Sequence, residues 1–309
     1  MPGRVGATER PGRGLAFAVA AYGLWGALPL YFVLLAPAGP FEIVGFRILL
    51  SLAFCLLLIT VTRGWRRFRA LLNDRRAVLL MGVAAAFIFV NWQVYVLAAL
   101  SGHIVEGSLG YFINPLVTVL LGVLVLRERL RPAQWAALGV SVAAIVVLAV
   151  GYGAVPWISL VLAFSFGLYG FVKKTAGPRV DAIGGLTLET AWAAPLAVTE
   201  LVAVAAVSGL VFGTAGAGHT ALMLAAGAAT ATPLLLFAAA ARRLSLVLLG
   251  LTQYIAPAMQ LVVGVVVLGE PMPLERWIGF ALVWVALAVL TVDMVVAARG
   301  PRRASLEPR

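Results

Sequence analysis

The chain has little charge and almost no cysteine. Only 11% of its 309 residues are charged, whereas 63% are hydrophobic and the mean hydropathy is +1.05. Soluble domains carry about 25% charged residues on a polar surface, so this composition excludes an ordinary soluble protein and favours a lipid bilayer as the solvent. The single cysteine, Cys55, lies inside an apolar run, which excludes a disulfide framework and a thiol metal site.

Acidic residues and histidines are also few. The chain has 12 Asp and Glu residues, and its two histidines, His103 and His219, have no partners at metal-ligand spacing. The sequence contains no HExxH, GxSxG or P-loop motif, so neither a membrane hydrolase nor an ATP-driven pump has motif support. We therefore expect no metal, no cofactor and no enzymatic activity.

The net charge of +11 indicates a membrane protein and not a nucleic-acid partner, because the basic residues form short clusters between apolar runs. Nearly all of the 23 Lys and Arg residues fall in the tails and in the loops of one face, with Arg47 and Arg276 as exceptions. By the positive-inside rule, both tails, residues 1–13 and 298–309, are predicted to be cytoplasmic. We expect a multi-pass protein of the bacterial inner membrane.

Ten apolar segments are each long enough to cross about 30 Å of hydrocarbon as a helix. The segments are continuously apolar without the alternation of a membrane strand, which favours helices. The first run is too long for a signal-peptide core and is taken as the first span. The predicted fold is thus an all-α integral membrane protein. Its ten predicted spans are 14–35, 40–62, 77–99, 104–126, 133–150, 155–173, 183–206, 220–241, 246–268 and 275–297.

Residues of the fourth and fifth predicted spans return in the second half of the chain at one constant spacing. The matched pairs are Pro115 and Pro257, Gly122 and Gly264, Leu126 and Leu268, Glu128 and Glu270, and Trp135 and Trp277. We interpret this as a duplication, with repeats at 14–150 and 155–297. Because five spans is an odd number, the second repeat must be inverted, which is typical of secondary transporters that bind substrate where the repeats meet. The alternative is a duplication that serves folding alone.

Several segments together resemble the EamA group of the drug/metabolite transporter superfamily. They are GLWGALPLYF at 23–32, FRILLS around Arg47, NWQVYVLA at 91–98, EGSLGYFINPLV at 106–117, LAFSFGLYGFVKK at 162–174, LET-W at 188–192 and LTQYIAP at 251–257. The resemblance implies ten helices in two inverted halves around a central cavity that opens alternately to each side. It also implies a permease, often an exporter of amphipathic compounds, with links to chloramphenicol resistance.

Polar and aromatic side chains inside spans are candidates for the wall of a substrate cavity, because polar groups there are costly and usually face the bundle interior. The candidates are Trp25, Asn91, Trp92, Tyr95, Tyr111, Asn114, Tyr169, Gln253 and Tyr254. Pro115 and Pro257 are the predicted helix kinks beside this cavity. The alternatives are interhelical hydrogen bonds that only hold the bundle together and, for Trp25 and Tyr169, an interfacial aromatic belt.

Three charged residues inside or beside spans are candidates for proton coupling or charge recognition. Glu106 begins the fourth span, where it is either a protonatable coupling group or an acid in a wet loop. Arg47 and Glu189 occupy equivalent positions of the two repeats, but inversion places them at opposite depths, so direct contact is not expected. Arg47 is expected to snorkel outward or to pair with Glu42 or Glu106, and Glu189 is a second proton-sensitive acid.

These patterns favour a secondary transporter that moves small amphipathic organic solutes or drugs by alternating access, with proton coupling as an open element. One alternative is a facilitated-diffusion carrier of amino acids or related metabolites. Another, from a different class, is an intramembrane enzyme that acts on a lipid-linked substrate. The expected partners are a small-molecule solute and the bilayer, and the Gly- and Ala-rich faces leave a homodimer open.

Overall fold

In the computed structural model, the described residues are 11–126, 130–152, 154–177, 180–241, 243–244 and 246–299. Every regular element among them is a helix, and nine of these helices are long and apolar enough to cross a membrane. The prediction of an all-helical membrane protein is therefore confirmed at this level. Most of the predicted tails, and Glu128 of the duplicated set, lie outside the described residues.

The helices follow one another with short connections. They are α1 (Pro11–Leu34), α2 (Pro40–Val61), α3 (Trp65–Leu72), α4 (Arg75–Leu100), α5 (Ile104–Leu126), α6 (Pro132–Tyr152), α7 (Trp157–Ala176), α8 (Ala182–Val207), α9 (Ala217–Ala241), α10 (Leu246–Thr252), α11 (Ile255–Val262), the π-helical segment η1 (Val263–Val267) and α12 (Leu274–Arg299). Pro40 begins α2 and Pro132 begins α6, where a missing backbone N–H costs nothing. The Asp74 carboxylate caps α4 by accepting from the Ala77 amide at 3.1 Å.

The predicted continuous span 246–268 is wrong, because the chain there forms α10, α11 and η1 instead of one helix. The break falls at Gln253 and Tyr254. Pro257 lies in the first turn of α11, and its ring would clash with the carbonyl of residue 253 in a continuous helix. Pro115, its counterpart, lies inside the unbroken helix α5. The two prolines therefore have different local outcomes.

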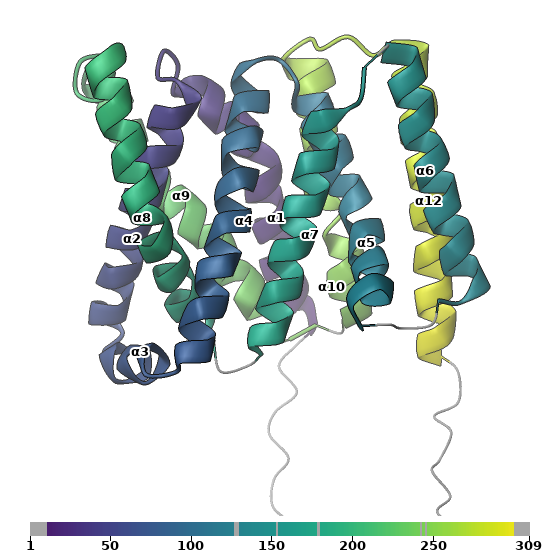
Figure 1. The fold of residues 1–309 in the computed structure, drawn as a ribbon, viewed down its shortest axis with the longest axis horizontal. Coiled ribbons are helices and arrows are strands. Elements are labelled where there is room, and N and C mark those ends of the chain that lie inside the picture. The colour runs from purple at the N-terminus through teal and green to yellow at the C-terminus, as the bar shows by residue number, and fades with distance from the viewer. Residues whose placement is uncertain are drawn as a thin grey trace, which may run out of the picture.

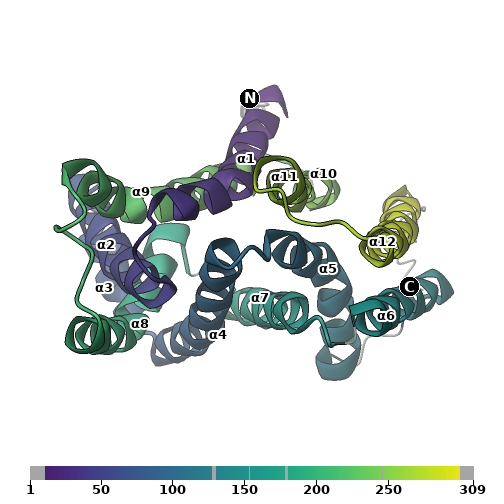
Figure 2. The same ribbon diagram turned by 90° about the horizontal axis from the view of Figure 1, so that it is seen from above.

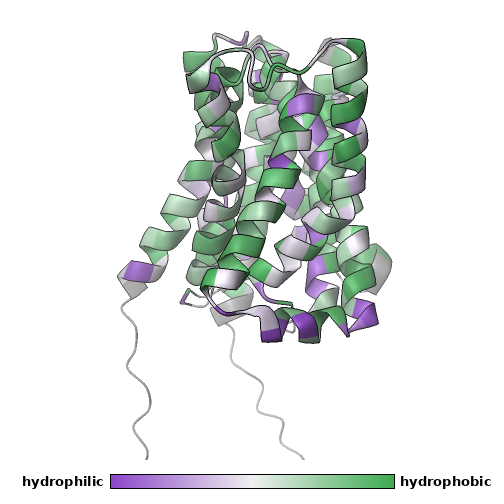
Figure 3. Ribbon diagram, turned by 90° about the vertical axis from the view of Figure 1, so that its left-hand side faces the viewer, coloured by the Kyte–Doolittle hydropathy of each residue, from purple (hydrophilic) through white to green (hydrophobic). Residues whose placement is uncertain are grey.

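The basic segment between the predicted spans 40–62 and 77–99 contains a helix that the sequence pattern did not predict. In α3, Phe68 and Leu71 are buried, while Arg66, Arg67 and Arg69 are exposed. A short helix with one apolar and one basic face is suited to lie in the plane of a membrane interface. Helix α3 lies at the end of the bundle where α1 begins and α12 ends (Figure 1). Hydrophilic residues are concentrated at that end, whereas most of the helix length is hydrophobic (Figure 3).

The long helices pack in a defined set of pairs, seen from above in Figure 2. Helix α2 packs against α8 and α9, and α4 packs against α7 and α8. Helices α6 and α12 pair with each other at the right-hand side of this view. Helix α5 contacts both α7 and α11. A Cβ atom on Gly227 of α9 would lie 2.4 Å from the carbonyl oxygen of Leu50 on α2, so only glycine permits this approach. The close crossing brings Thr230, one turn further along α9, to the side of α2 that carries Arg47.

Candidate functional site

Arg47 is the charged group around which the polar residues of the bundle gather. Its side chain extends from α2 and is only 4% exposed. Its Nε donates a hydrogen bond to Thr230 Oγ1 on α9 at 2.9 Å. The guanidinium carbon lies 4.3 Å from the centre of the Trp92 ring on α4 and 5.3 Å from that of Phe32 on α1. Three helices, α1, α4 and α9, therefore hold this cation by hydrogen bonding and cation–π contact.

No carboxylate pairs with Arg47 among the described residues, whose ion pairs include Arg131–Asp293 and Lys173–Glu189. Neither predicted pair forms, since Glu42 accepts from the backbone amides of Val211 and Phe212, and Glu106 accepts from that of Ile158. The outward snorkelling is also wrong, because the side chain is buried. Its Nη1 atom is buried without a hydrogen-bond partner.

Four of the predicted cavity residues come together beside Arg47, namely Asn91, Trp92, Tyr95 and Tyr111. The Asn91 side-chain amide on α4 donates to Leu162 O at 3.2 Å and to Ser165 Oγ at 3.0 Å, both on α7. Its oxygen accepts from the Tyr111 hydroxyl on α5 at 2.9 Å. Asn91 thus fixes the orientation of Tyr111.

Tyr95 completes this group. Its ring packs edge-on against Tyr111 at 5.5 Å and against Phe32 at 6.1 Å. Its hydroxyl is buried and has no hydrogen-bond partner. We call Arg47, Trp92, Tyr95 and Tyr111 the Arg47 cluster. Within it, one guanidinium nitrogen and one hydroxyl remain unsatisfied, although buried polar groups are normally hydrogen-bonded.

A second polar group joins α7 to α8. Glu189, 1% exposed, accepts from Lys173 Nζ at 2.5 Å and from the Tyr169 hydroxyl at 3.1 Å. Glu189 is therefore held within its own half of the chain, apart from Arg47. The sequence pattern placed Lys173 among the basic loop residues, but its ammonium group forms an ion pair with the buried carboxylate of Glu189.

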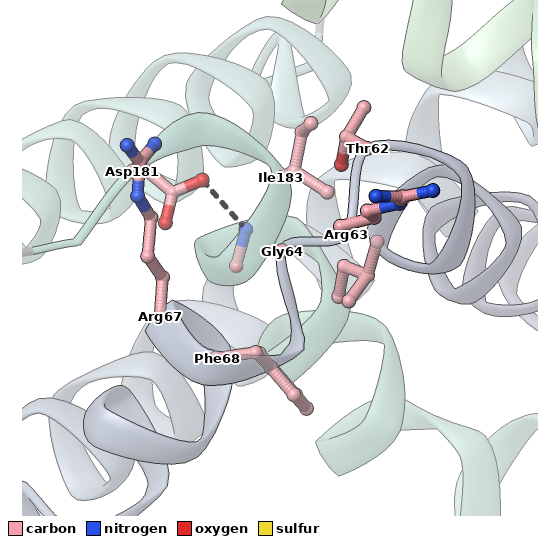
Figure 4. A pocket seen from close by; sticks show the side chains of 9 residues that line it. Thr62, Arg63, Gly64, Arg67, Phe68, Asp181 and Ile183 are labelled. Atoms are coloured by element: carbon pink, nitrogen blue, oxygen red, sulfur yellow. Dashed lines mark hydrogen bonds between the residues drawn. The ribbon is translucent and has the colours of Figure 1, made fainter.

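A pocket of about 380 Å³ lies at the end of the bundle that carries α3 (Figure 4). Arg63, Arg67 and the start of α8 line it, and there Asp181 accepts from the Gly184 amide at 3.2 Å. A Cβ atom on the next residue, Gly185, would lie 2.9 Å from Lys173 Nζ. The start of α8 therefore separates this pocket from the Lys173–Glu189 pair.

At the opposite end of the bundle, α5 is closely apposed to α11 and η1. The buried carboxylate of Glu270 accepts from the amides of Ile104 and Val105 at 2.6 and 2.8 Å, at the N-terminus of α5. Four residues further along α5, Ser108 Oγ donates to Pro257 O at 2.8 Å. Charged hydrogen bonds to helix N-terminal amides are among the stronger ones. We call these two contacts together, Glu270 with Ile104 and Val105 and Ser108 with Pro257, the α5–α11 closure.

Glu106 lies beside the α5–α11 closure but faces α7. One of its carboxylate oxygens accepts from the Ile158 amide at 3.1 Å, and its backbone carbonyl accepts from Ser159 Oγ at 2.6 Å. Glu106 therefore connects the start of α5 to the start of α7. A role in proton coupling stays a prediction.

The remaining candidates have other contacts, although Trp25 packs against the apolar cluster that contains Trp92 and Tyr95. The carbonyl of Trp25 accepts from Gln260 Nε2 at 3.3 Å. Tyr254 stacks on Phe112 within a separate apolar cluster, and Gln253 lies at the break before α11. The Asn114 side-chain oxygen is buried without a partner. Cavity roles for these residues stay predictions.

Several polar residues of the site were not among the predicted ones. Thr230, Ser165 and Gln260 carry hydroxyl or amide groups common in any membrane helix, so no sequence signal singles them out. Glu200 is different, because an acid inside the predicted span 183–206 was visible in the sequence. Its carboxylate accepts from the side-chain amide of Gln93, joining α8 to α4. Among the described residues, no three potential metal ligands gather.

Many membrane-length helices with buried polar side chains between them define a polytopic α-helical membrane protein. The sequence model of the EamA-like transporter family matches residues 12–150. The chain is 47% identical over 289 residues to Protein RarD from Streptomyces exfoliatus, covering 94% of this chain and 91% of that protein. It is 38% identical over 289 residues to the uncharacterized transporter YojE from Bacillus subtilis, covering 92% and 95%. The chain belongs to the EamA-like transporter family and is a membrane transporter similar to RarD.

A solved crystal structure shares the fold. It superposes with a TM-score of 0.59, covers 91% of this chain and 98% of its own, and is 21% identical in sequence. At that identity, the likeness extends to the fold alone.

Proposed function

We propose that this protein is a secondary transporter that binds a small organic solute at the Arg47 cluster and moves it by alternating access. The observation that carries the proposal is the pair of unsatisfied buried polar atoms, Arg47 Nη1 and the Tyr95 hydroxyl. Polar groups inside a membrane protein are costly when they are left unpaired, and those that occur there commonly mark a substrate or ion pathway. The aromatic rings around them give the site an amphipathic character.

The proposed architecture is two inverted repeats of five spans, with α10, α11 and η1 together as one broken span. The helix pairs support it, because several contacts between the two halves have a counterpart related by the proposed symmetry. The α1–α9 contact corresponds to α7–α4, α2–α9 to α8–α4, and α1–α11 to α7–α5. Helices α2 and α8, α5 and α11, and α6 and α12 each pair with their own counterpart. A broken span near the repeat interface is typical of secondary transporters.

The proposed orientation places the α3 end of the bundle in the cytoplasm of a bacterium. The exposed arginines of α3 and the start of α4 support this, since cytoplasmic loops are enriched in Lys and Arg. The α5–α11 closure would then lie at the outer face. Alternating access requires this contact to separate so that solute can leave or enter on that side.

Proton antiport is the proposed energy source, because the sequence has no ATP-binding motif. Glu189 and Glu106 are the proposed proton carriers. The second candidate function is facilitated diffusion of amino acids or related metabolites, which would need no proton carrier. The two differ in their dependence on a pH gradient.

The test is solute flux in sealed liposomes that contain the purified protein. A panel of amino acids, aromatic metabolites and drugs, including chloramphenicol, is measured with and without an imposed pH gradient. The proposal expects saturable flux of at least one solute class above that of protein-free liposomes. Flux that follows the gradient supports antiport, and gradient-independent flux supports facilitated diffusion. Absence of flux for every compound would contradict transport.

A further inference from the structure

We infer that the transported solute carries a carboxylate attached to a flat apolar group, and that the Arg47 guanidinium binds this carboxylate. The inference rests on the proposed function and names its substrate class. Four observations carry it: the missing counter-charge, the unsatisfied donors, the fixed guanidinium plane and the aromatic surroundings.

The missing counter-charge is the first observation. A guanidinium remains protonated in proteins, so a buried arginine normally has an acidic partner. Among the described residues, no carboxylate forms an ion pair with Arg47. Glu42 and Glu106, the partners expected from the sequence, accept hydrogen bonds from backbone amides instead. A mobile anion supplies the charge that the described part of the protein does not.

Donor geometry is the second observation. The Nε–H of Arg47 is used by Thr230, whereas Nη1 has two N–H donors and no acceptor. The buried Tyr95 hydroxyl, in the same cluster, also lacks a partner. An arginine edge and a hydroxyl donor together suit the two oxygens of a carboxylate. Tyr31 differs, because its hydroxyl is already bonded to Leu222 O at 2.7 Å.

The third observation is the fixed plane of the guanidinium, and the fourth is the aromatic surface around it. Trp92 lies against the guanidinium, and Thr230 fixes its edge, so the cation keeps one orientation. Such a held plane distinguishes arginine from lysine, whose ammonium is a point charge. Tyr95, Tyr111 and Phe32 then border the position of a bound carboxylate with aromatic surface. A single fixed cation matches a solute of one negative charge, and it repels a solute whose only charge is positive.

The test uses the full-length protein in detergent and four compounds that share one skeleton. These are 3-phenylpropionate, 3-phenylpropanamide, 3-phenylpropylamine and phenylalanine, supplemented by a set of other aromatic and aliphatic carboxylates. Affinities are measured by quenching of tryptophan fluorescence and by thermal shift, since a ligand of the folded state raises the melting temperature. We expect compounds with a free carboxylate to bind at least tenfold more tightly than the amide and the amine.

Variants then connect the preference to Arg47. Arg47→Gln should weaken carboxylate binding at least tenfold and abolish the preference over the amide, and Arg47→Lys should restore part of it. Arg131→Gln, which removes a cation of the separate Arg131–Asp293 pair, is the matched control and should leave affinity unchanged. If Arg47→Gln does not fold, two measurements still test the inference. They are carboxylate binding by Tyr95→Phe, which should be weakened, and the ratio of the affinities of the unmodified protein for the acid and the amide.

The outcomes separate this inference from the proposed function. Flux of neutral or cationic solutes without binding of any carboxylate overturns the inference and leaves transport intact. Equal binding of acid, amide and amine also overturns it. Absence of flux for every solute contradicts transport itself, and the inference falls with it.

Discussion

The guanidinium carbon of Arg47 lies 4.3 Å from the centre of the Trp92 ring, so a buried cation rests on an aromatic face instead of on a carboxylate. The two residues come from different helices, α2 and α4, which also contact each other. This relationship sets the orientation of the guanidinium that we propose as the anion-binding group. The first prediction concerns its aromatic half.

Trp92→Leu is expected to weaken solute binding by about 2- to 30-fold, because a cation–π contact contributes about 0.5–2 kcal/mol. Trp92→Phe should lose less, since a smaller ring retains part of the attraction. Solute affinity is measured by thermal shift with a carboxylate probe. Trp65→Phe, on the exposed face of α3, is the control. Unchanged affinity in Trp92→Leu would mean that the indole does not position Arg47.

The Lys173–Glu189 pair should respond asymmetrically to removal of either partner. Lys173→Met leaves the carboxylate of Glu189, 1% exposed, without its counter-charge, and loss of one partner of a buried pair costs about 3–5 kcal/mol. Glu189→Gln should cost less, because the Lys173 side chain is 29% exposed and its ammonium can reach water.

Thermal unfolding in detergent compares the two single variants with the double variant Lys173→Met with Glu189→Leu. The double variant should be more stable than Lys173→Met alone, since it removes the stranded charge. An equal or lower melting temperature for the double variant would show that the pair does not act as a unit.

Glu270→Gln is expected to loosen the α5–α11 closure. Hydrogen bonds to a charged group contribute about 1.5–3 kcal/mol each, and a neutral amide retains only part of this. A single cysteine at Ser108, the buried residue of α5 that contacts Pro257 within the closure, reports the opening in a Cys55→Ala background that is shared by all variants compared.

Labelling of that cysteine by a membrane-impermeant maleimide should become roughly tenfold faster after Glu270→Gln. The control is Glu275→Gln, which changes an acid in the first turn of α12. Equal labelling rates with and without Glu270 would contradict a role for this carboxylate in closing the bundle.

Gly227→Ala tests the crossing of α9 and α2. A Cβ atom there would lie 2.4 Å from a backbone oxygen, so the helices must shift, at a cost of about 1–3 kcal/mol. Gly139→Ala is the matched control, because a Cβ atom at that position meets nothing within 4 Å. Glycine is a poor helix former, so this control should be neutral or stabilising by up to about 1 kcal/mol. Equal melting temperatures of the two variants would contradict the close crossing.

Much of the architecture follows from local properties of the sequence. Hydropathy alone places the nine long helices, because each span must satisfy its backbone hydrogen bonds internally. The grouping of Asn91, Trp92, Tyr95 and Tyr111 was also foreseeable, since polar side chains in neighbouring spans turn toward each other. These predictions needed only periodicity and the cost of burial.

Tertiary partners were beyond such reasoning. Arg47 donates a hydrogen bond to Thr230, which is 183 positions away, and the sequence around either residue does not indicate this pairing. Lys173 looked like a loop cation because Lys174 follows it, yet its position on α7 faces Glu189. Pro115 and Pro257 match in the predicted duplication, but only the second lies at a helix break, because the outcome depends on the packing around each proline.

The most direct test of the central claim is solute flux in proteoliposomes, measured for the unmodified protein and for Arg47→Gln in parallel. The account predicts saturable flux of an aromatic carboxylate through the unmodified protein, at least a tenfold loss in Arg47→Gln and partial recovery in Arg47→Lys. Equal carboxylate flux in folded Arg47→Gln and in the unmodified protein would contradict it, because the buried cation would then have no part in recognising the solute.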